Sequence, residues 1–255
     1  DSTKRNSLVV VRPESREHLH PAPAAITDTL LTDSLHIRNL TFDGAGMQLA
    51  WLASADTAAT KKYELYYYPA VSQKKGKKAV FRKPGLAALP KDWFPSANGA
   101  MYFSEEGSKL FFGTAPYSKP AGKDSLHAEE KAKLDIWSHT DTILKPRQLK
   151  QEAQKKRQTY LAVYRVNENR LIQLADPTVE NLRLMHRNNG ELAIGSDRKP
   201  HERSSTWSSR QLTDYYLVDL KNGQKTSLLK GGQYLQLSPS ARFVVWFDSD
   251  QRQYY

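Results

Sequence analysis

Two groups of side chains in this sequence have types and spacings that could take part in binding chemistry. Glu129-Glu130 is a paired acid within a polar insertion, in a short stretch (127–132) that we expect to be helical. His18 and His20 have an i, i+2 spacing that would place two metal ligands on one face of a strand. Because no third His or carboxylate completes a recognisable pattern with them, we interpret them as surface histidines.

The sequence has no catalytic or cofactor-binding signature. No Ser has Gly two residues before it, so the G-x-S-x-G nucleophile elbow is missing. There is no H-E-x-x-H, no Walker phosphate loop and no G-x-G-x-x-G. Zero cysteines exclude disulfides, thiolate catalysis and Cys-ligated zinc. We therefore expect no catalytic residue, cofactor or metal in this chain. A carboxylate site without a known signature stays open as an alternative, although Glu105-Glu106 and Asp248/Asp250 fall at expected turns, where solvation explains them.

The charge of the chain is strongly basic, with a formal net charge of +11 over 255 residues. Lysine and arginine cluster in polar stretches between expected strands, at Lys61-Lys62, Lys74-Lys75, Lys77-Lys78 and Lys155-Lys156-Arg157. None of these clusters falls in an RNA-reading strand or a helix-turn-helix, so we interpret them as solvated loops and expect no nucleic-acid partner. No apolar run approaches the roughly 18 residues of a membrane span. No stretch has the form of a charged-then-apolar leader with a small-residue cleavage site, and both ends are abrupt, so we expect a processed or excised piece of something longer.

The sequence predicts that β-strands position any site, because one hairpin pattern occurs four times. In each copy an apolar reference residue is followed by apolar residues at +7 and +9, with turn-forming residues between. The copies are Phe42/Leu49/Trp51, Phe103/Leu110/Phe112, Met185/Leu192/Ile194 and Leu237/Val244/Trp246. Strand residues two apart face the same side, so +7 and +9 should point into one layer. The four copies align without a gap, and such repeats indicate stacked or radially arranged sheets.

Further strand-like runs extend each hairpin toward a four-stranded blade. Leu8–Val11 is a candidate strand in the N-terminal segment. The other runs are Tyr63–Tyr68, Lys78–Phe81, Leu134–Trp137, Tyr160–Tyr164, Leu171–Leu174, Tyr215–Leu220 and Lys225–Leu229. The last two flank Asn222-Gly223, a strong hairpin signal. The stretch 145–158 is polar and helix-permissive, so we expect a surface excursion there.

The predicted fold is therefore an all-β, incomplete β-propeller of about four antiparallel four-stranded blades with polar insertions. We place the blades at about 37–83, 98–175, 180–230 and, in part, 233–255. The N-terminal segment, 1–36, has no clear place in this scheme. Unrelated hairpins in a β-sandwich are the alternative interpretation.

Several segments in order resemble a known family. Phe103–Gly113 is similar to the "F-S-x-D-G" hairpins of TolB-like and peptidase propellers. The stretches 134–138, 144–149, 214–223 and 237–248 resemble bacterial prolyl oligopeptidase-family serine peptidases. This resemblance implies a non-catalytic N-terminal propeller that gates and positions a peptide substrate. Its partner would be a C-terminal α/β-hydrolase domain of the same polypeptide, and its location periplasmic or extracellular.

The resemblance carries over no catalytic residue, since the family's triad belongs to the hydrolase domain. In the dipeptidyl-peptidase branch, a Glu pair on an inserted propeller segment holds the substrate's N-terminus. Glu129 and Glu130 also lie in an insertion, but the residues around them do not reproduce that motif, so a solvated pair is the favoured interpretation. Two departures, His186-Arg187-Asn188 for Ser-x-Asp and Ala241 for the turn Gly, leave the blade boundaries open. The competing function is a stand-alone TolB-like module that binds a protein or an anionic glycan.

Overall fold

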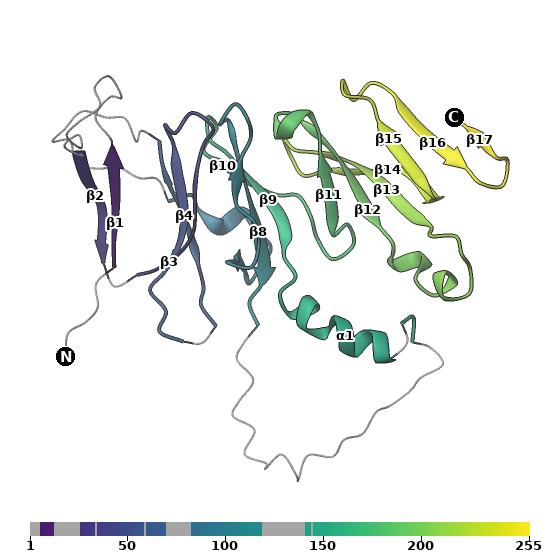
Figure 1. The fold of residues 1–255 in the computed structure, drawn as a ribbon, viewed down its shortest axis with the longest axis horizontal. Helices are drawn as coiled ribbons and strands as arrows, with labels where there is room; N and C mark the ends of the chain where they lie inside the picture. The colour runs from purple at the N-terminus through teal and green to yellow at the C-terminus, as the bar shows by residue number, and fades with distance from the viewer. Residues whose placement is uncertain are drawn as a thin grey trace, which may run out of the picture.

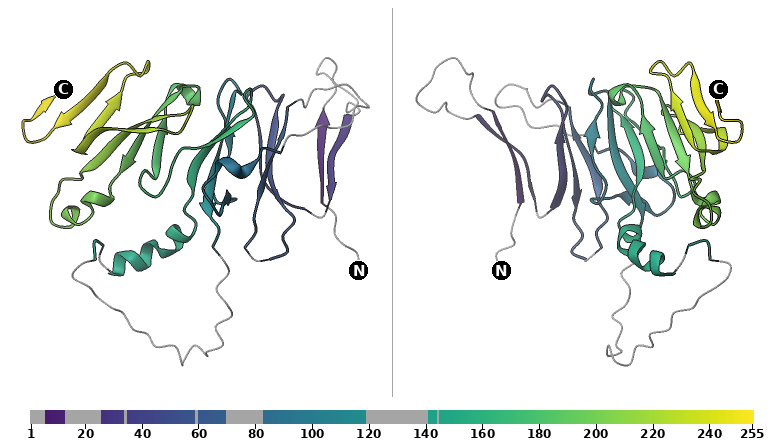
Figure 2. Two further views of the ribbon diagram at one scale, coloured as in Figure 1. Left: turned by 180° about the vertical axis from the view of Figure 1, so that it is seen from behind. Right: turned by 45° about the vertical axis from the view of Figure 1, so that its right-hand side comes forward.

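A computed structural model describes residues 6–12, 26–33, 35–58, 60–69, 83–118, 141–143 and 145–255. Their strands form five antiparallel sheets that follow one another in chain order, from the purple N-terminal end to the yellow C-terminal end (Figure 1). Figure 2 shows the same sheets standing face to face in a curved row. In four of the sheets, strands adjacent in sequence pair with one another, as in propeller blades. In the remaining sheet, β6 and β7 both pair with β8, which is followed by β9 and β10. The prediction of an all-β, propeller-like fold is confirmed.

We number the sheets along the chain. The N sheet pairs β1 (Asn6–Arg12) with β2 (Ile26–Asp33). Sheet 1 contains β3 (His36–Phe42), β4 (Leu49–Ser54) and β5 (Glu64–Tyr68). Sheet 2 contains β6 (Trp93–Pro95), β7 (Tyr102–Phe103), β8 (Lys109–Pro116), β9 (Tyr160–Arg165) and β10 (Arg170–Gln173). Sheet 3 contains β11 (Asn181–Leu184), β12 (Leu192–Asp197), β13 (Thr213–Asp219) and β14 (Lys225–Gly232). Sheet 4 contains β15 (Tyr234–Leu237), β16 (Val244–Asp248) and β17 (Gln253–Tyr254).

The described helices lie in the connections between strands. The polar stretch after 144 forms α1 (Lys145–Lys156), which has no buried residue and is therefore the expected surface excursion. The short 3₁₀ turns are η1 (Leu86–Ala88), η2 (His186–Asn188), η3 (Lys199–His201) and η4 (Ser204–Thr206).

Three copies of the repeated hairpin share the same hydrogen bonds. In the first, second and fourth copies, the N–H of residue +1 donates to the carbonyl oxygen of residue +6, at 2.8 to 3.1 Å. The N–H of residue +4 donates to the carbonyl oxygen of residue +1, at 2.8 to 3.0 Å. The side chain at +1 also accepts from the N–H of +6, at Asp43, Ser104 and Ser238. The turn residues of the sequence pattern therefore close the hairpins as polar caps.

The third copy departs from the pattern, and its gapless alignment is wrong. Leu184 pairs with Ala193, and both face sheet 2, whereas Ile194 at +9 packs toward sheet 4. In the other copies, +7 and +9 face the preceding sheet. A turn two residues longer explains the change, because equivalent residues here are separated by nine positions. The extra residues are accommodated by positive φ at three successive residues, His186, Arg187 and Asn188.

The core of the molecule lies between the sheets. Alternate residues of each central strand point to opposite neighbours, so Leu110 and Phe112 pack toward sheet 1 and Phe111 packs toward sheet 3. All three are fully buried. At about 25 cal/mol per Å² of buried apolar surface, these aromatic and aliphatic faces are the main contribution that holds the sheets together.

Most of the extra strands predicted in the described part of the chain are confirmed. Leu8–Val11 lies in β1, Tyr63–Tyr68 contains β5, and β9 pairs with β10 across Asn167–Asn169. Strands β13 and β14 flank Asn222-Gly223, and Gly223 has a φ of +76°. The predicted strands Lys78–Phe81 and Leu134–Trp137 lie outside the described residues.

Candidate functional site

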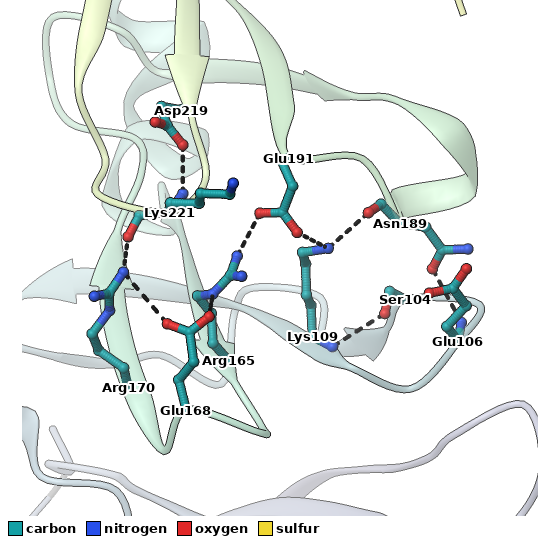
Figure 3. Close-up of polar contacts among 10 residues, drawn as sticks. All are labelled: Ser104, Glu106, Lys109, Arg165, Glu168, Arg170, Asn189, Glu191, Asp219 and Lys221. Atoms are coloured by element: carbon teal, nitrogen blue, oxygen red, sulfur yellow. Dashed lines mark hydrogen bonds and ion pairs between the residues drawn. The ribbon is translucent and has the colours of Figure 1, made fainter. Parts of the chain in front are cut away.

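The best-developed polar site joins sheets 2 and 3 at the end of the molecule where the repeated turns lie (Figure 3). Lys109 stands at the start of β8, and its side chain is 5% exposed. Its Nζ donates to the carbonyl oxygen of Asn189 at 2.7 Å and pairs with Glu191 at 2.8 Å. The other oxygen of Glu191 accepts from Arg165 Nη1 at 2.6 Å, and Arg165 Nε pairs with Glu168 at 2.5 Å. We call Lys109, Arg165, Glu168 and Glu191 the ion cluster.

The pairing of β8 with β9 and the course of the third turn explain why these groups meet. Arg165 ends β9 opposite Lys109 on β8, so the two strands hold the cations side by side. Glu191 follows the long third turn, which crosses to sheet 2. That turn is anchored there by two further contacts. The backbone N–H of Glu106 donates to Asn189 Oδ1, and the backbone N–H of Glu105 donates to the carbonyl oxygen of Arg187. The extended third turn is thus the bridge between the two sheets.

The charges in the ion cluster are mutually stabilised. Partial burial by itself would raise the pKa of Glu191, but hydrogen bonds from Arg165 and Lys109 outweigh it and lower that pKa. Burial likewise opposes the charge of Arg165, and hydrogen bonds to Glu191 and Glu168 raise its pKa. Each cation therefore has a carboxylate partner, and each carboxylate has a cation.

This arrangement suits structural clamping rather than catalysis. The hydroxyl of Ser104 accepts from the backbone N–H of Lys109 and so stabilises the turn. The charged groups of the ion cluster are paired with one another across the two sheets, as structural ion pairs are. The cluster was not found from the sequence. The signal present in the sequence is Lys109, a lysine that interrupts an apolar strand pattern.

A second polar pair connects the long β12–β13 connection to sheet 3. His201 Nε2 lies 2.7 Å from Asp214 Oδ1, which also accepts from the N–H of Gly231 at 2.8 Å. Burial opposes the charge of Asp214, but these hydrogen bonds lower its pKa. The neighbouring Ser204 hydroxyl donates to the backbone carbonyl of His201 and not to its ring. The pair therefore anchors η3 and does not form a Ser-His-Asp arrangement.

Two shallow hollows lie beside sheets 2 and 3. One, of about 380 Å³, is lined at its polar side by Arg170 and Lys221. The other, of about 260 Å³, is lined by residues of both sheets, among them Tyr102, Glu180 and Asn181. Burial raises the pKa of Tyr102, so its phenol is a neutral hydrogen-bonding group at ordinary pH. We interpret these hollows as candidate ligand-binding sites and not as catalytic sites.

The site residues proposed from the sequence are not brought together by the described structure. Glu129 and Glu130, and likewise His18 and His20, lie outside the described residues. Among the residues that are described, no group of three or more His, Asp or Glu side chains is placed to hold a metal ion. Within the same residues, no helix has both the length and the apolar character needed to cross a bilayer.

Comparisons with known proteins give only distant structural similarities. No family model and no curated protein matches this sequence. Among solved structures, TolB from Acinetobacter baumannii is 11% identical with a TM-score of 0.33, over 88% of this chain and 40% of that one. A prolyl endopeptidase is 10% identical with a TM-score of 0.38, over 86% of this chain and 29% of that one. An uncharacterized protein from Listeria monocytogenes is 10% identical with a TM-score of 0.38, over 97% of this chain and 57% of that one. The chain thus spans less than two thirds of each of these structures, and they do not assign it to a family.

Proposed function

We propose that this chain is the non-catalytic β-propeller part of a prolyl oligopeptidase-family serine peptidase in the periplasm or outside the cell. In this role it gates and positions a peptide substrate for a C-terminal α/β-hydrolase domain of the same polypeptide. The supporting observation is the row of stacked sheets. In the described residues, the ion cluster and the His201–Asp214 pair connect structural elements to one another and do not form a catalytic site. The family-like segments of the sequence point the same way.

The hollow of about 260 Å³ is the candidate contact for the peptide. It lies between sheets 2 and 3, and its lining includes residues of β7 and β11. Tyr102 offers an aromatic face and Asn181 a side-chain amide, which suit an apolar side chain and a peptide backbone respectively. Glu180 is already paired with Lys199, so it contributes less charge than its type suggests.

Two measurements test this proposal. The gene sequence after the Tyr255 codon should encode a hydrolase domain with a G-x-S-x-G elbow, and a stop codon there would contradict the proposal. In addition, the chain on its own should bind a labelled proline-containing peptide without hydrolysing it. Asn181→Ala should weaken that binding, while Asn222→Ala, at the other hollow, should not.

The alternative function is a stand-alone TolB-like module that binds an anionic glycan or a protein. The observation that favours it is the hollow of about 380 Å³, where the side chains of Arg170 and Lys221 stand on one rim. Arg170 also donates to the carbonyl oxygen of Lys221 and pairs with Glu168 at 3.6 Å, which fixes its position. Under this alternative, Lys221→Ala reduces retention on an anionic glycan column, and the chain shows no affinity for peptides.

A further inference from the structure

The topology sends two kinds of connection to opposite ends of the molecule. In an up-and-down sheet, the turns between strands one and two and between three and four lie at one end. The connections between strands two and three lie at the other. We call the first group the turn end (43–48, 104–108, 166–169, 185–191, 220–224 and 238–243). The second group, as far as it is described, is the connection end (55–58, 60–63, 117–118, 141–143, 145–159, 198–212 and 249–252).

The two ends differ in charge. The described residues of the connection end include thirteen Lys or Arg and five Asp or Glu, a formal excess of eight positive charges. The loops of the turn end carry three Lys or Arg and five Asp or Glu, and two of these acids, Glu168 and Glu191, are paired with cations at the adjoining strand ends (Lys109, Arg165 and Arg170). The link Leu174–Glu180 adds two acids near the connection end, but Asp176 pairs with Lys225 and Glu180 pairs with Lys199. Among the described loops, the basic excess therefore lies at the connection end.

Helix α1 is the most basic element of the connection end. It holds five Lys or Arg against the single acid Glu152, which pairs with Lys156 at 2.7 Å. No residue of the helix is buried, so its position is not explained by core packing. Figures 1 and 2 show α1 and the 3₁₀ turns η3 and η4 projecting from the same end in all views.

The connection end also carries an exposed tryptophan side chain. Trp207 follows η4 and is 86% exposed, more than any other large apolar side chain in the described structure. Leu149 on α1 is 52% exposed at the same end. A solitary exposed Trp beside Lys and Arg is the combination found at membrane–water interfaces, where the ring sits at headgroup level.

The shape of the connection end favours an extended partner over a small ligand. The basic residues are distributed over the connections of four consecutive sheets and do not line a pocket. The hollow that reaches this end, through Thr159 and Glu180, has no Lys or Arg in its lining, and the hollow with Arg170 and Lys221 belongs to the turn end. A broad polyanionic surface matches a dispersed set of cations, since each contributes independently to binding.

We propose that the connection end docks the protein on the surface of a bilayer that contains anionic phospholipid, through the basic residues of α1 and the indole of Trp207. The turn end lacks this basic excess, so the charge asymmetry also sets the orientation. The sheets would then stand upright on the membrane, with the turn end facing the aqueous phase. This peripheral attachment involves no membrane-spanning segment.

Co-sedimentation with vesicles tests the proposal. The intact chain should bind phosphatidylcholine vesicles that contain phosphatidylglycerol, should ignore pure phosphatidylcholine, and should be released by salt. The triple variant Lys150→Glu, Lys155→Glu, Lys156→Glu should lower the partition coefficient roughly a hundredfold, because each basic residue near the surface contributes independently. Trp207→Ala should weaken binding further at constant charge. All four positions are exposed, so the fold should be unchanged.

A matched control separates this surface from general charge. Arg187→Glu, Lys221→Glu, Arg242→Glu makes the same charge change at the turn end and should leave vesicle binding close to that of the parent chain. Equal losses in the two triple variants would overturn the proposal. So would absence of binding to anionic vesicles at low salt, or tighter binding of soluble heparin than of vesicles, which would identify a glycan surface instead.

Discussion

At the scale of single residues, the +4 position of the repeated turn decides local strain. Gly46 and Gly107 occupy it with φ of +68° and +69°, and Ala241 occupies it in the fourth copy with φ of +55°. An alanine in this left-handed region costs about 1–2 kcal/mol, part of which is recovered through its lower entropy in the unfolded chain. Ala241→Gly should therefore raise the free energy of unfolding by about 0.5–1 kcal/mol, measured by urea denaturation.

The reverse exchange provides the comparison. A Cβ on Gly107 would lie 2.4 Å from Gln48 Nε2, which donates to the Gly107 carbonyl oxygen across the boundary of sheets 1 and 2. Gly107→Ala should thus destabilise the protein by at least about 1–2 kcal/mol. If Ala241→Gly and Gly107→Ala shifted the urea midpoint in the same direction, the backbone conformation of this turn would not be the source of the strain.

The ion cluster predicts a specific response to acid. The pKa of Glu191 is lowered in the folded protein, because hydrogen bonds from Arg165 and Lys109 outweigh partial burial. A carboxyl group with a lowered folded pKa stabilises the protein above its unfolded value of about 4.3 and loses that contribution as the pH falls through the folded pKa. Glu191→Gln should therefore reduce stability at pH 7 and flatten its decline below about pH 4.3. Urea midpoints recorded from pH 7 to acid check this, and parallel curves for the two proteins would contradict it.

At the scale of elements, the strands follow from the sequence because alternating apolar residues and Gly- or Asn-containing turns act locally. Phe103 pairs with Leu110 and Leu237 pairs with Val244, as the +7 spacing predicts. The third copy fails for a reason that spacing alone cannot reveal. Its turn is longer by two residues, and a shift in the equivalent positions exchanges the faces on which side chains lie. Which sheet Ile194 meets is decided by tertiary packing.

The ion cluster was equally out of reach, since its members are separated by more than fifty residues between Lys109 and Arg165. A pattern within one strand gives no information about Glu191, which arrives from another sheet through the third turn. The signal present in the sequence was a lysine where a buried residue was due. The interpretation of Glu129 and Glu130 as a solvated pair stays a prediction, because both lie outside the described residues.

The clamp between sheets 2 and 3 can be tested through Lys109. Lys109→Met keeps the apolar stem but removes the charge that meets Asn189 and Glu191. Since Lys109 is buried and Glu191 would lose one of two partners, we expect a loss of about 1–3 kcal/mol in the free energy of unfolding. The matched control is Arg187→Ala, which breaks the pair with Glu105 at a side chain that is 82% exposed. That exchange should leave the urea midpoint unchanged, and equal losses in both variants would contradict the clamp.

At the scale of the whole molecule, the two terminal faces of the row of numbered sheets differ. On sheet 1, the side chains facing the N sheet are buried, as Leu49 and Trp51 are fully inaccessible. On sheet 4, Val244 and Trp246 pack against sheet 3, while Val245 faces away and is 46% exposed. The same outer face carries an aromatic row across three strands, in which Phe247 pairs with Tyr234 on one side and Tyr254 on the other. The outer face of sheet 4 is thus an apolar surface of the kind that other sheets bury.

This open face predicts association with a second copy of the chain. The corresponding face of sheet 1 is already covered, so we expect an isologous contact, sheet 4 against sheet 4. We expect light scattering to show a mass that rises with concentration toward a dimer, and Val245→Lys to hold the chain as a monomer, since it places a charge at the centre of the contact. Leu228→Lys, at a residue of β14 that is 36% exposed, is the matched control and should leave dimerisation intact. A mass that stays monomeric at all concentrations, or equal dissociation in both variants, would show that sheet 4 is not the contact.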